Sequence, residues 1–247
     1  MSVPHRLPRV AVALDVATAE DALHIVDCLE PTAAVWKVGL ELFTVAGPTL
    51  VRDVMSRGGE VFLDLKLHDI PNTVARAVAA AAELGVGWLT VHAAGGSGML
   101  RAAVDAAPPE LRLLAVTVLT SLGAAGTAEV FGREDADPGT EALRLARLAE
   151  SAGVLGFVCS GQEIEPLREA LGAAAFLVTP GIRPVGSAAG DQARVTTPTD
   201  ATRRGSDLLV IGRPVIQSPD PRAALRQILQ EVRVAHQARV DSQQERG

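Results

Sequence analysis

The chain has 247 residues, is 48 % hydrophobic and carries a formal net charge of −6. Its length suits one large domain or two small ones, and its apolar content supports a substantial core. The acidic balance, the lack of a basic tract and the 3 % aromatic content argue against a nucleic-acid binder, which needs cationic patches and rings for stacking.

Short apolar runs alternate with helical patterns along the whole chain. The runs are too apolar to leave one face in water, as expected for parallel strands covered by helices. Eight strands are predicted, at 10–16, 34–39, 60–67, 88–94, 112–120, 156–161, 175–182 and 207–215. Helices are predicted between and after them, at 18–29, 47–57, 71–84, 98–106, 140–152, 162–171, 199–204 and 219–236.

Eight strand–helix units predict an α/β fold, a (β/α)₈ barrel of the TIM type. A doubly wound open sheet is the alternative, because periodicity alone does not close a barrel. We expect one domain over 1–247, with a core of about 9–236 and a polar, frayed tail at 237–247. Two long connections, 121–139 and 183–198, have the length typical of functional loops.

The N-terminal residues contain no apolar signal core, and no apolar run has membrane-spanning length. The two cysteines, Cys28 and Cys159, lie far apart in apolar surroundings and are expected to be free thiols. These features predict a soluble cytoplasmic protein without a membrane partner.

Lysine is almost absent from this chain: the only two, Lys37 and Lys66, fall late in the second and third predicted strands. Unlike a guanidinium, an ammonium group can lose its proton, so these positions are interpreted as ones that need an ammonium. The catalytic groups of a (β/α)₈ barrel lie at the carboxyl ends of its strands. Asp15, Asp64 and, just beyond the third strand, Asp69 belong to the same ring of positions.

Asp64 and Lys66 are two residues apart on a strand and should point to the same side. With Lys37 on the adjacent strand, they predict an alternating array of acids and bases. A structural ion-pair network at the barrel mouth remains an alternative. For Asp69, which stands just before a predicted helix, an N-cap role is equally consistent with the spacing.

A second candidate site lies after strands 7 and 8, the usual phosphate-binding corner of this fold. Gly212 permits close approach of a phosphate to the backbone, and Arg213 can pair with it. The loop after strand 7 brings Arg183 and Gln192 to the same corner. The sequence therefore predicts a phosphorylated ligand.

These residues belong to a series of motifs that resembles the bacterial orotidine 5′-phosphate decarboxylases. The matching segments span residues 12 to 215 and are, in order, "ALDV", "KVGLELF", "FLDLKLHDIPNTV", "TVHAAGG", "VTVLTS", "TPGIRP", the Gly-Asp-Gln of loop 7 and "VIGRPV". The string D-x-K-x-x-D-I-P-x-T, in order with the others, is highly specific.

The resemblance implies decarboxylation of orotidine 5′-monophosphate to uridine 5′-monophosphate, without metal or organic cofactor, in a homodimer with shared active sites. Lys66 would donate the proton and form the charge array with Lys37, Asp64 and an Asp69 from the partner subunit. Further roles are implied for residues that contact the substrate: Asp15 and Lys37 at the ribose; Thr120 and Ser121 at the pyrimidine; Arg183, Gln192, Gly212 and Arg213 at the phosphate; and Ile70 and Thr73 across the dimer interface.

Two other functions are weighed against this one. Keto-sugar-phosphate decarboxylases and synthases share the third-strand motif but use Mg²⁺ with a Glu late in strand 2, where this chain has Lys37. A non-catalytic nucleotide-phosphate sensor is the second. A non-catalytic protein would be expected to lose buried charges that cost stability, yet both lysines and all three aspartates are present.

Overall fold

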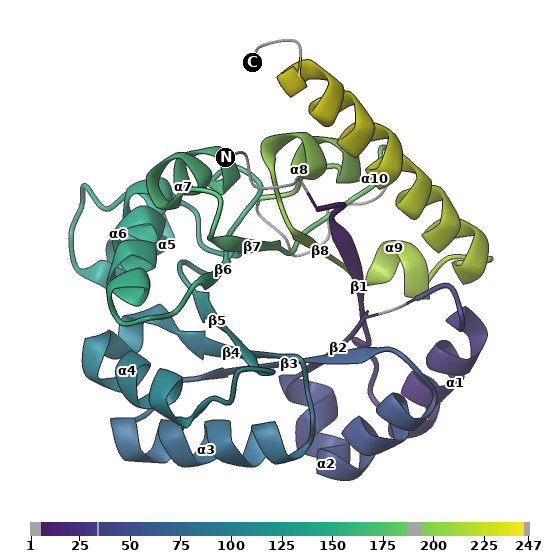
Figure 1. Ribbon diagram of the computed structural model, residues 1–247, viewed down its shortest axis with the longest axis horizontal. Coiled ribbons are helices and arrows are strands. Elements are labelled where there is room, and N and C mark those ends of the chain that lie inside the picture. Colours follow the sequence, from purple (N-terminus) through teal and green to yellow (C-terminus); the bar gives the residue numbers. More distant parts are fainter. Residues whose placement is uncertain (1–5, 34, 187–193, 245–247) are drawn as a thin grey trace.

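The computed structural model describes residues 6–33, 35–186 and 194–244. Within these ranges, eight parallel strands close into a barrel, because β1 pairs with β2 on one side and with β8 on the other (Figure 1). The predicted (β/α)₈ barrel is therefore confirmed, and the open-sheet alternative is wrong.

The strands are short, as expected for a closed parallel sheet. They are β1 (Arg9–Ala13), β2 (Val35–Gly39), β3 (Glu60–Leu67), β4 (Trp88–His92), β5 (Arg112–Val116), β6 (Gly156–Val158), β7 (Phe176–Thr179) and β8 (Leu208–Ile211). All eight coincide with predicted runs, although most end earlier than predicted. The residues at the ends of those predicted runs therefore belong to the connections at the barrel mouth.

Helices form the layer around the barrel (Figure 1). They are α1 (Ala19–Leu29), α2 (Leu40–Ser56), α3 (Pro71–Glu83), the short η1 (Ala93–Gly95), α4 (Gly96–Ala106), α5 (Ala124–Phe131), α6 (Pro138–Ser151), α7 (Ile164–Leu171), α8 (Pro198–Arg204), α9 (Arg213–Ile216) and α10 (Pro221–Gln244). None of the described helices combines the length and apolar character needed to cross a membrane.

Several of the described helical segments differ from the prediction. Two of them, η1 and α9, begin inside the runs 88–94 and 207–215 that were predicted as strands. α2 begins directly after β2 and is interrupted at Gly47, whose φ of 63° precedes Pro48; only the part after this break was predicted. α5 lies inside the connection that was expected to be a loop. α10 continues to Gln244, so the expectation of a frayed tail from 237 is wrong for the part of the tail that the structure describes. Arg239 ties this part to α8 through the carbonyl of Thr202 at 3.5 Å.

Successive side chains of a strand point to opposite faces of the sheet, and this divides the core into two layers. Residues such as Val10 and Val12 pack outward against the helices. The inward-facing residues fill the barrel: Ala11, Ala13, Val35, Phe62, Trp88, Leu114, Val178, Leu208 and Val210. The interior of the barrel is therefore a packed core and not a channel.

Candidate active site

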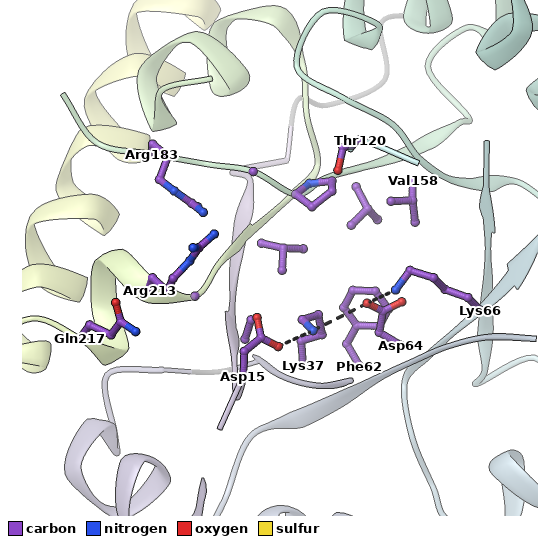
Figure 2. A pocket seen from close by; sticks show the side chains of 16 residues that line it. Asp15, Lys37, Phe62, Asp64, Lys66, Thr120, Val158, Arg183, Arg213 and Gln217 are labelled. Carbon is purple, nitrogen blue, oxygen red and sulfur yellow. Dashed lines mark hydrogen bonds and ion pairs between the residues drawn. The ribbon is translucent and has the colours of Figure 1, made fainter. Parts of the chain in front are cut away.

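A cavity of about 440 Å³ opens at the carboxyl ends of the strands (Figure 2). Its floor is the top of the barrel core and is apolar, formed by Ala13, Phe62, Val158, Val178 and Val210. Its walls are polar and charged, and carry Asp15, Lys37, Asp64, Lys66, Thr120, Arg183, Arg213 and Gln217. Such a cavity suits a ligand that has both an apolar part and charged groups.

Four charged side chains of alternating sign run along one wall of the cavity. Lys37 Nζ lies 3.0 Å from Asp15 Oδ1 and 3.7 Å from Asp64 Oδ2, and Lys66 Nζ lies 2.8 Å from the same Asp64 oxygen (Figure 2). The side chains of Lys37 and Asp64 are only 12 % and 13 % exposed. The structure thus brings together the acids and bases predicted to form an array within one chain.

The pKa of Asp64 reflects this arrangement. Burial raises the pKa of its carboxyl. The ammonium groups of Lys37 and Lys66, and the hydrogen bonds from Lys66 and Thr90, lower this pKa by more, so that it lies below the ordinary value of 3.8. Asp64 is therefore a carboxylate at neutral pH.

This lowered pKa gives a testable pH dependence. Because the folded state favours ionised Asp64, its contribution to stability is present above pH 3.8, the ordinary value, and is lost as the pH falls through the lower folded-state pKa. The difference in free energy of unfolding between wild type and Asp64→Asn should therefore shrink as the pH falls from 5 towards 3. Urea titrations across that range measure it, and a difference that stays constant would contradict the assignment.

Lys66 has an unusual backbone. Its φ of 48° is positive, which holds for no other non-glycine residue in the described ranges. It lies where the register between β3 and β4 shifts, between Leu63 and Leu67. The prediction that Lys66 and Asp64 point to the same side assumed regular alternation along the strand. Lys66 does not follow that alternation. A backbone outlier at a cluster of charges is typical of functional sites.

Two guanidinium groups occupy the opposite side of the cavity from Lys66 (Figure 2). Arg183 follows β7, and Arg213 begins α9 directly after Gly212. A Cβ atom on Gly212 would stand 3.3 Å from Asp15 Oδ2 and 3.4 Å from the Cβ of Ala13, so the backbone passes tightly there. The predicted phosphate corner therefore has its two arginines in place. Gln192, which was predicted to join them, lies outside the described residues.

The remaining predicted residues divide into two groups. Thr120 lines the cavity, whereas Ser121 is exposed and is not among the described residues that line it. Asp69, Ile70 and Thr73 are also exposed and lie outside the cavity of their own chain. The structure therefore does not bring these three into contact with the array within a single chain.

The N-cap interpretation of Asp69 is wrong. Ile70 is the N-cap of α3 and makes no side-chain capping bond, while Pro71 takes the first helical position. The carboxylate of Asp69 accepts a hydrogen bond from the adjacent amide of Ile70 at 2.6 Å. This leaves the carboxylate on the surface beside Ile70, which is 67 % exposed.

Sequence reasoning missed two groups near the site, Gln217 and Thr90, and favoured a core histidine for a third, His92. Gln217, the C-cap residue of α9, lines the cavity beside Arg213. Thr90, buried in β4, bonds to both Asp64 and Lys66. His92, at the end of β4, lies beside His68 with ring centroids 5.4 Å apart. Burial, His68 and Lys66 all lower the pKa of His92 below 6.5, which favours the neutral imidazole.

A buried ion pair supports the rim of the cavity. Arg194 and Glu163 are 8 % and 2 % exposed and pair directly. Arg194 also donates to the carbonyl of Leu119 at 3.2 Å, next to Thr120, and Glu163 accepts from the amide of Ser160 at 2.8 Å. These bonds tie the connections that follow β5, β6 and β7 to one another.

Removal of one partner of this pair should be costly, because it leaves an uncompensated buried charge. We expect Glu163→Ala to lower the free energy of unfolding by about 3–5 kcal/mol. Glu60→Ala is the matched control, since Glu60 pairs with Arg9 at 2.6 Å on the surface, and it should cost about 1 kcal/mol or less. Urea unfolding measures both, and equal losses would contradict the structural role of the buried pair.

Comparison with known proteins agrees with this geometry. Residues 8–228 match the model of the orotidine 5′-phosphate decarboxylase / HUMPS family. The chain is 52 % identical to an orotidine 5′-phosphate decarboxylase of Salmonella typhi over 223 residues, covering 89 % of this chain and 90 % of the relative. It is also 52 % identical to one of Photobacterium profundum, covering 91 % and 98 %.

A solved structure is similar as well. The crystal structure of orotidine 5′-phosphate decarboxylase from Lactobacillus acidophilus superposes with a TM-score of 0.79 at 37 % identity, covering 91 % of this chain and 99 % of that one. The family model, the sequence relatives and this structure all cover nearly the whole barrel. The chain belongs to the orotidine 5′-phosphate decarboxylase / HUMPS family.

Proposed function

We propose that this protein decarboxylates orotidine 5′-monophosphate to uridine 5′-monophosphate, the last step of de novo pyrimidine biosynthesis. One observation carries the proposal beyond family membership. The ammonium of Lys66 is held 2.8 Å from Asp64 on one side of a cavity whose other side carries Arg183 and Arg213 (Figure 2). A nucleotide with its phosphate at the arginines would direct its base towards Lys66.

The chemistry requires a positive group that can also release a proton. The bond between carbon 6 and the carboxylate breaks, carbon dioxide leaves, and the electron pair remains on carbon 6. The Lys66 ammonium stabilises that charge and then transfers a proton from Nζ to carbon 6. Lys66 regains a proton from solvent. An arginine could supply the charge but not readily the proton.

Asp64 holds the ammonium in position through its 2.8 Å contact with Lys66. Lys37 balances the charge of Asp64 from the other side. We assign Asp15 and Lys37 to the ribose hydroxyls, since both line the cavity between Lys66 and the arginines (Figure 2). Thr120 and Ser121, in the connection after β5, are assigned to the pyrimidine. Thr120 is the better supported of the two, because it lines the cavity.

Phosphate binding at Arg183, Gly212, Arg213 and Gln192 has a second role. Slow reactions need up to about 23 kcal/mol of barrier lowering, which a single charge contact cannot supply. Binding energy from a remote, non-reacting phosphate can be used to position the reacting part of the substrate. The two arginines are therefore expected to affect turnover as well as affinity.

The proposal includes a homodimer in which Asp69, Ile70 and Thr73 of one subunit complete the site of the other. The observation that favours it is exposure: Asp69 is on the surface, and Ile70 and Leu40 are 67 % and 52 % exposed although apolar. Leu40 lies in a small cleft that also contains Lys37, Asp64 and Lys66, so this apolar surface borders the array. A second subunit covering it would bring new side chains next to Lys66.

The Mg²⁺-dependent branch of the family is disfavoured by Lys37. Its ammonium stands between the carboxylates of Asp15 and Asp64 at 3.0 and 3.7 Å, where a divalent cation would need them as ligands. Two positive centres cannot share that place without strong repulsion. The donor set therefore suits a nucleotide substrate held without a metal.

A substrate comparison tests the proposal. Purified protein should convert orotidine 5′-monophosphate in the presence of EDTA, followed by the absorbance change of the pyrimidine, and should not act on 3-keto-gulonate 6-phosphate with or without Mg²⁺. The reverse preference, or activity abolished by EDTA, would support the metal-dependent branch. Binding of uridine 5′-monophosphate with no turnover at high enzyme concentration would support the non-catalytic sensor.

A further inference from the structure

Thr90 is the polar residue of β4 that is buried most completely, with 0 % exposure. Its hydroxyl makes two hydrogen bonds, both to β3. The Oγ1 atom accepts from the backbone amide of Lys66 at 2.8 Å and donates to Asp64 Oδ1 at 3.0 Å. One side chain therefore contacts the backbone of the lysine and the carboxylate that pairs with its ammonium.

The position of Thr90 in the sheet explains why it can do this. β3 and β4 are in register at Phe62–Trp88 and Leu63–Leu89, and again at Leu67–Val91. Residues 64–66 therefore stand opposite Thr90 alone. An extra segment in one strand interrupts the backbone ladder and leaves amides that need other partners. The Thr90 hydroxyl is the partner for the amide of Lys66.

The same segment contains the positive φ of Lys66, 48°. Residues other than glycine, asparagine and aspartate seldom adopt this conformation, and it persists only where the surroundings impose it. The bond to Thr90 fixes the amide at one end of this residue. At the other end, the ammonium of Lys66 donates to Asp64, and Thr90 orients Asp64 as well.

We propose that Thr90 is a positioning residue for the reaction: its hydroxyl holds Lys66 in the positive-φ conformation and sets the orientation of the Asp64 carboxylate, so that the ammonium points into the cavity. This inference rests on the proposed decarboxylation. Among the described residues, neither Thr90 nor any other residue of β4 lines the cavity. Thr90 acts through Asp64 and Lys66, which do line it.

Three variants separate positioning from simple packing. Thr90→Val keeps the shape and removes the hydroxyl, and Thr90→Ser keeps the hydroxyl. Thr117→Val is the matched control, because Thr117 is 3 % exposed and its hydroxyl donates to the carbonyl of Val158 at 2.9 Å, away from the array. For each variant, kcat, KM, the Kd of uridine 5′-monophosphate and thermal stability are measured.

A displacement of about 1 Å in a catalytic group can cost about 10²-fold in rate, so Thr90→Val should lower kcat by about that factor. Its KM and Kd should stay within about threefold of wild type, since the binding groups are unchanged. Thr90→Ser should recover most of the lost kcat, and Thr117→Val should lose stability without losing kcat. Wild-type kcat in Thr90→Val, or no recovery in Thr90→Ser, would overturn the proposal.

A crystal structure of Thr90→Val gives a readout that does not depend on the substrate. Lys66 should leave the positive-φ region, or its Nζ should move away from Asp64; an unchanged Lys66 would overturn the proposal. If the wild type fails to decarboxylate while Lys66 is displaced in the variant, the proposed function fails and the positioning role stands. If Thr90→Val does not fold, Thr90→Ala compared with Thr90→Ser gives the same test.

Discussion

Lys66→Ala should lower kcat for orotidine 5′-monophosphate by at least about 10⁴-fold. Loss of a proton donor typically costs about 10²–10⁴-fold, and loss of a preorganised charge facing the reacting atom about 10²–10³-fold. Binding of uridine 5′-monophosphate should survive within about tenfold, because Arg183 and Arg213 lie on the other side of the cavity (Figure 2). Steady-state kinetics and calorimetric titration with the product measure the two effects.

Lys66→Arg is the matched control for this prediction. It keeps a positive charge near Asp64 but provides no group that readily releases a proton, so it should also be nearly inactive. Both variants should fold, since Asp64 keeps Lys37 at 3.7 Å and the hydroxyl of Thr90 at 3.0 Å. Turnover near the wild-type rate in Lys66→Ala would remove Lys66 from the proposed role.

Lys66→Ala and Asp69→Ala chains should each be inactive alone and active when mixed. If Asp69 serves the neighbouring subunit, a mixed dimer has one site with both lesions and one site with neither. Random exchange of equal amounts makes half of the dimers mixed, so about a quarter of the wild-type activity should return. Activity measured against time of mixing, together with native mass spectrometry of the dimers, gives the result.

The control for this experiment is a mixture of Lys66→Ala with Asp64→Ala. Asp64 and Lys66 belong to the same site in one chain, at 2.8 Å, so each site of a mixed dimer carries one lesion and no activity should return. Proven subunit exchange without rescue in the Asp69 mixture would place Asp69 in the site of its own chain.

Much of this fold was accessible from the sequence because its signals are strong. Apolar runs without a polar face occur where strands are covered on both sides, so the eight strands could be located. The charged residues of the site were visible because they interrupt those runs: Asp64 and Lys66 stand in β3, and Lys37 in β2. Buried charges in a parallel barrel have few explanations other than a site or an ion-pair network.

The parts that were missed have no such signal. Thr90 is a β-branched residue in a strand, where threonine is common, so nothing marked its hydroxyl as a partner of Asp64 and Lys66. The extra residues of β3 are invisible to a pattern that assumes strict alternation. Helix α5 lies within the connection 121–139, whose glycine, alanine and acidic residues suggested a loop, and α2 was predicted only after its break at Gly47.

Asp69 shows a different limit. Its place before a helix fitted an N-cap, but α3 begins with Pro71 and is capped by the backbone at Ile70. The distinction depends on one residue of register, which spacing does not fix. The exposed carboxylate that results is meaningful only if a second subunit approaches it, and a single chain carries no direct sign of that approach.

The most direct test of the account is release of carbon dioxide from orotidine 5′-monophosphate labelled in its carboxylate, with EDTA present. Purified protein should release one labelled carbon dioxide for each uridine 5′-monophosphate formed, and Lys66→Ala should release none above the enzyme-free control. No release by the wild type at high enzyme concentration, or release that requires added Mg²⁺, would contradict the central claim that the Lys66 ammonium, held by Asp64, performs the reaction.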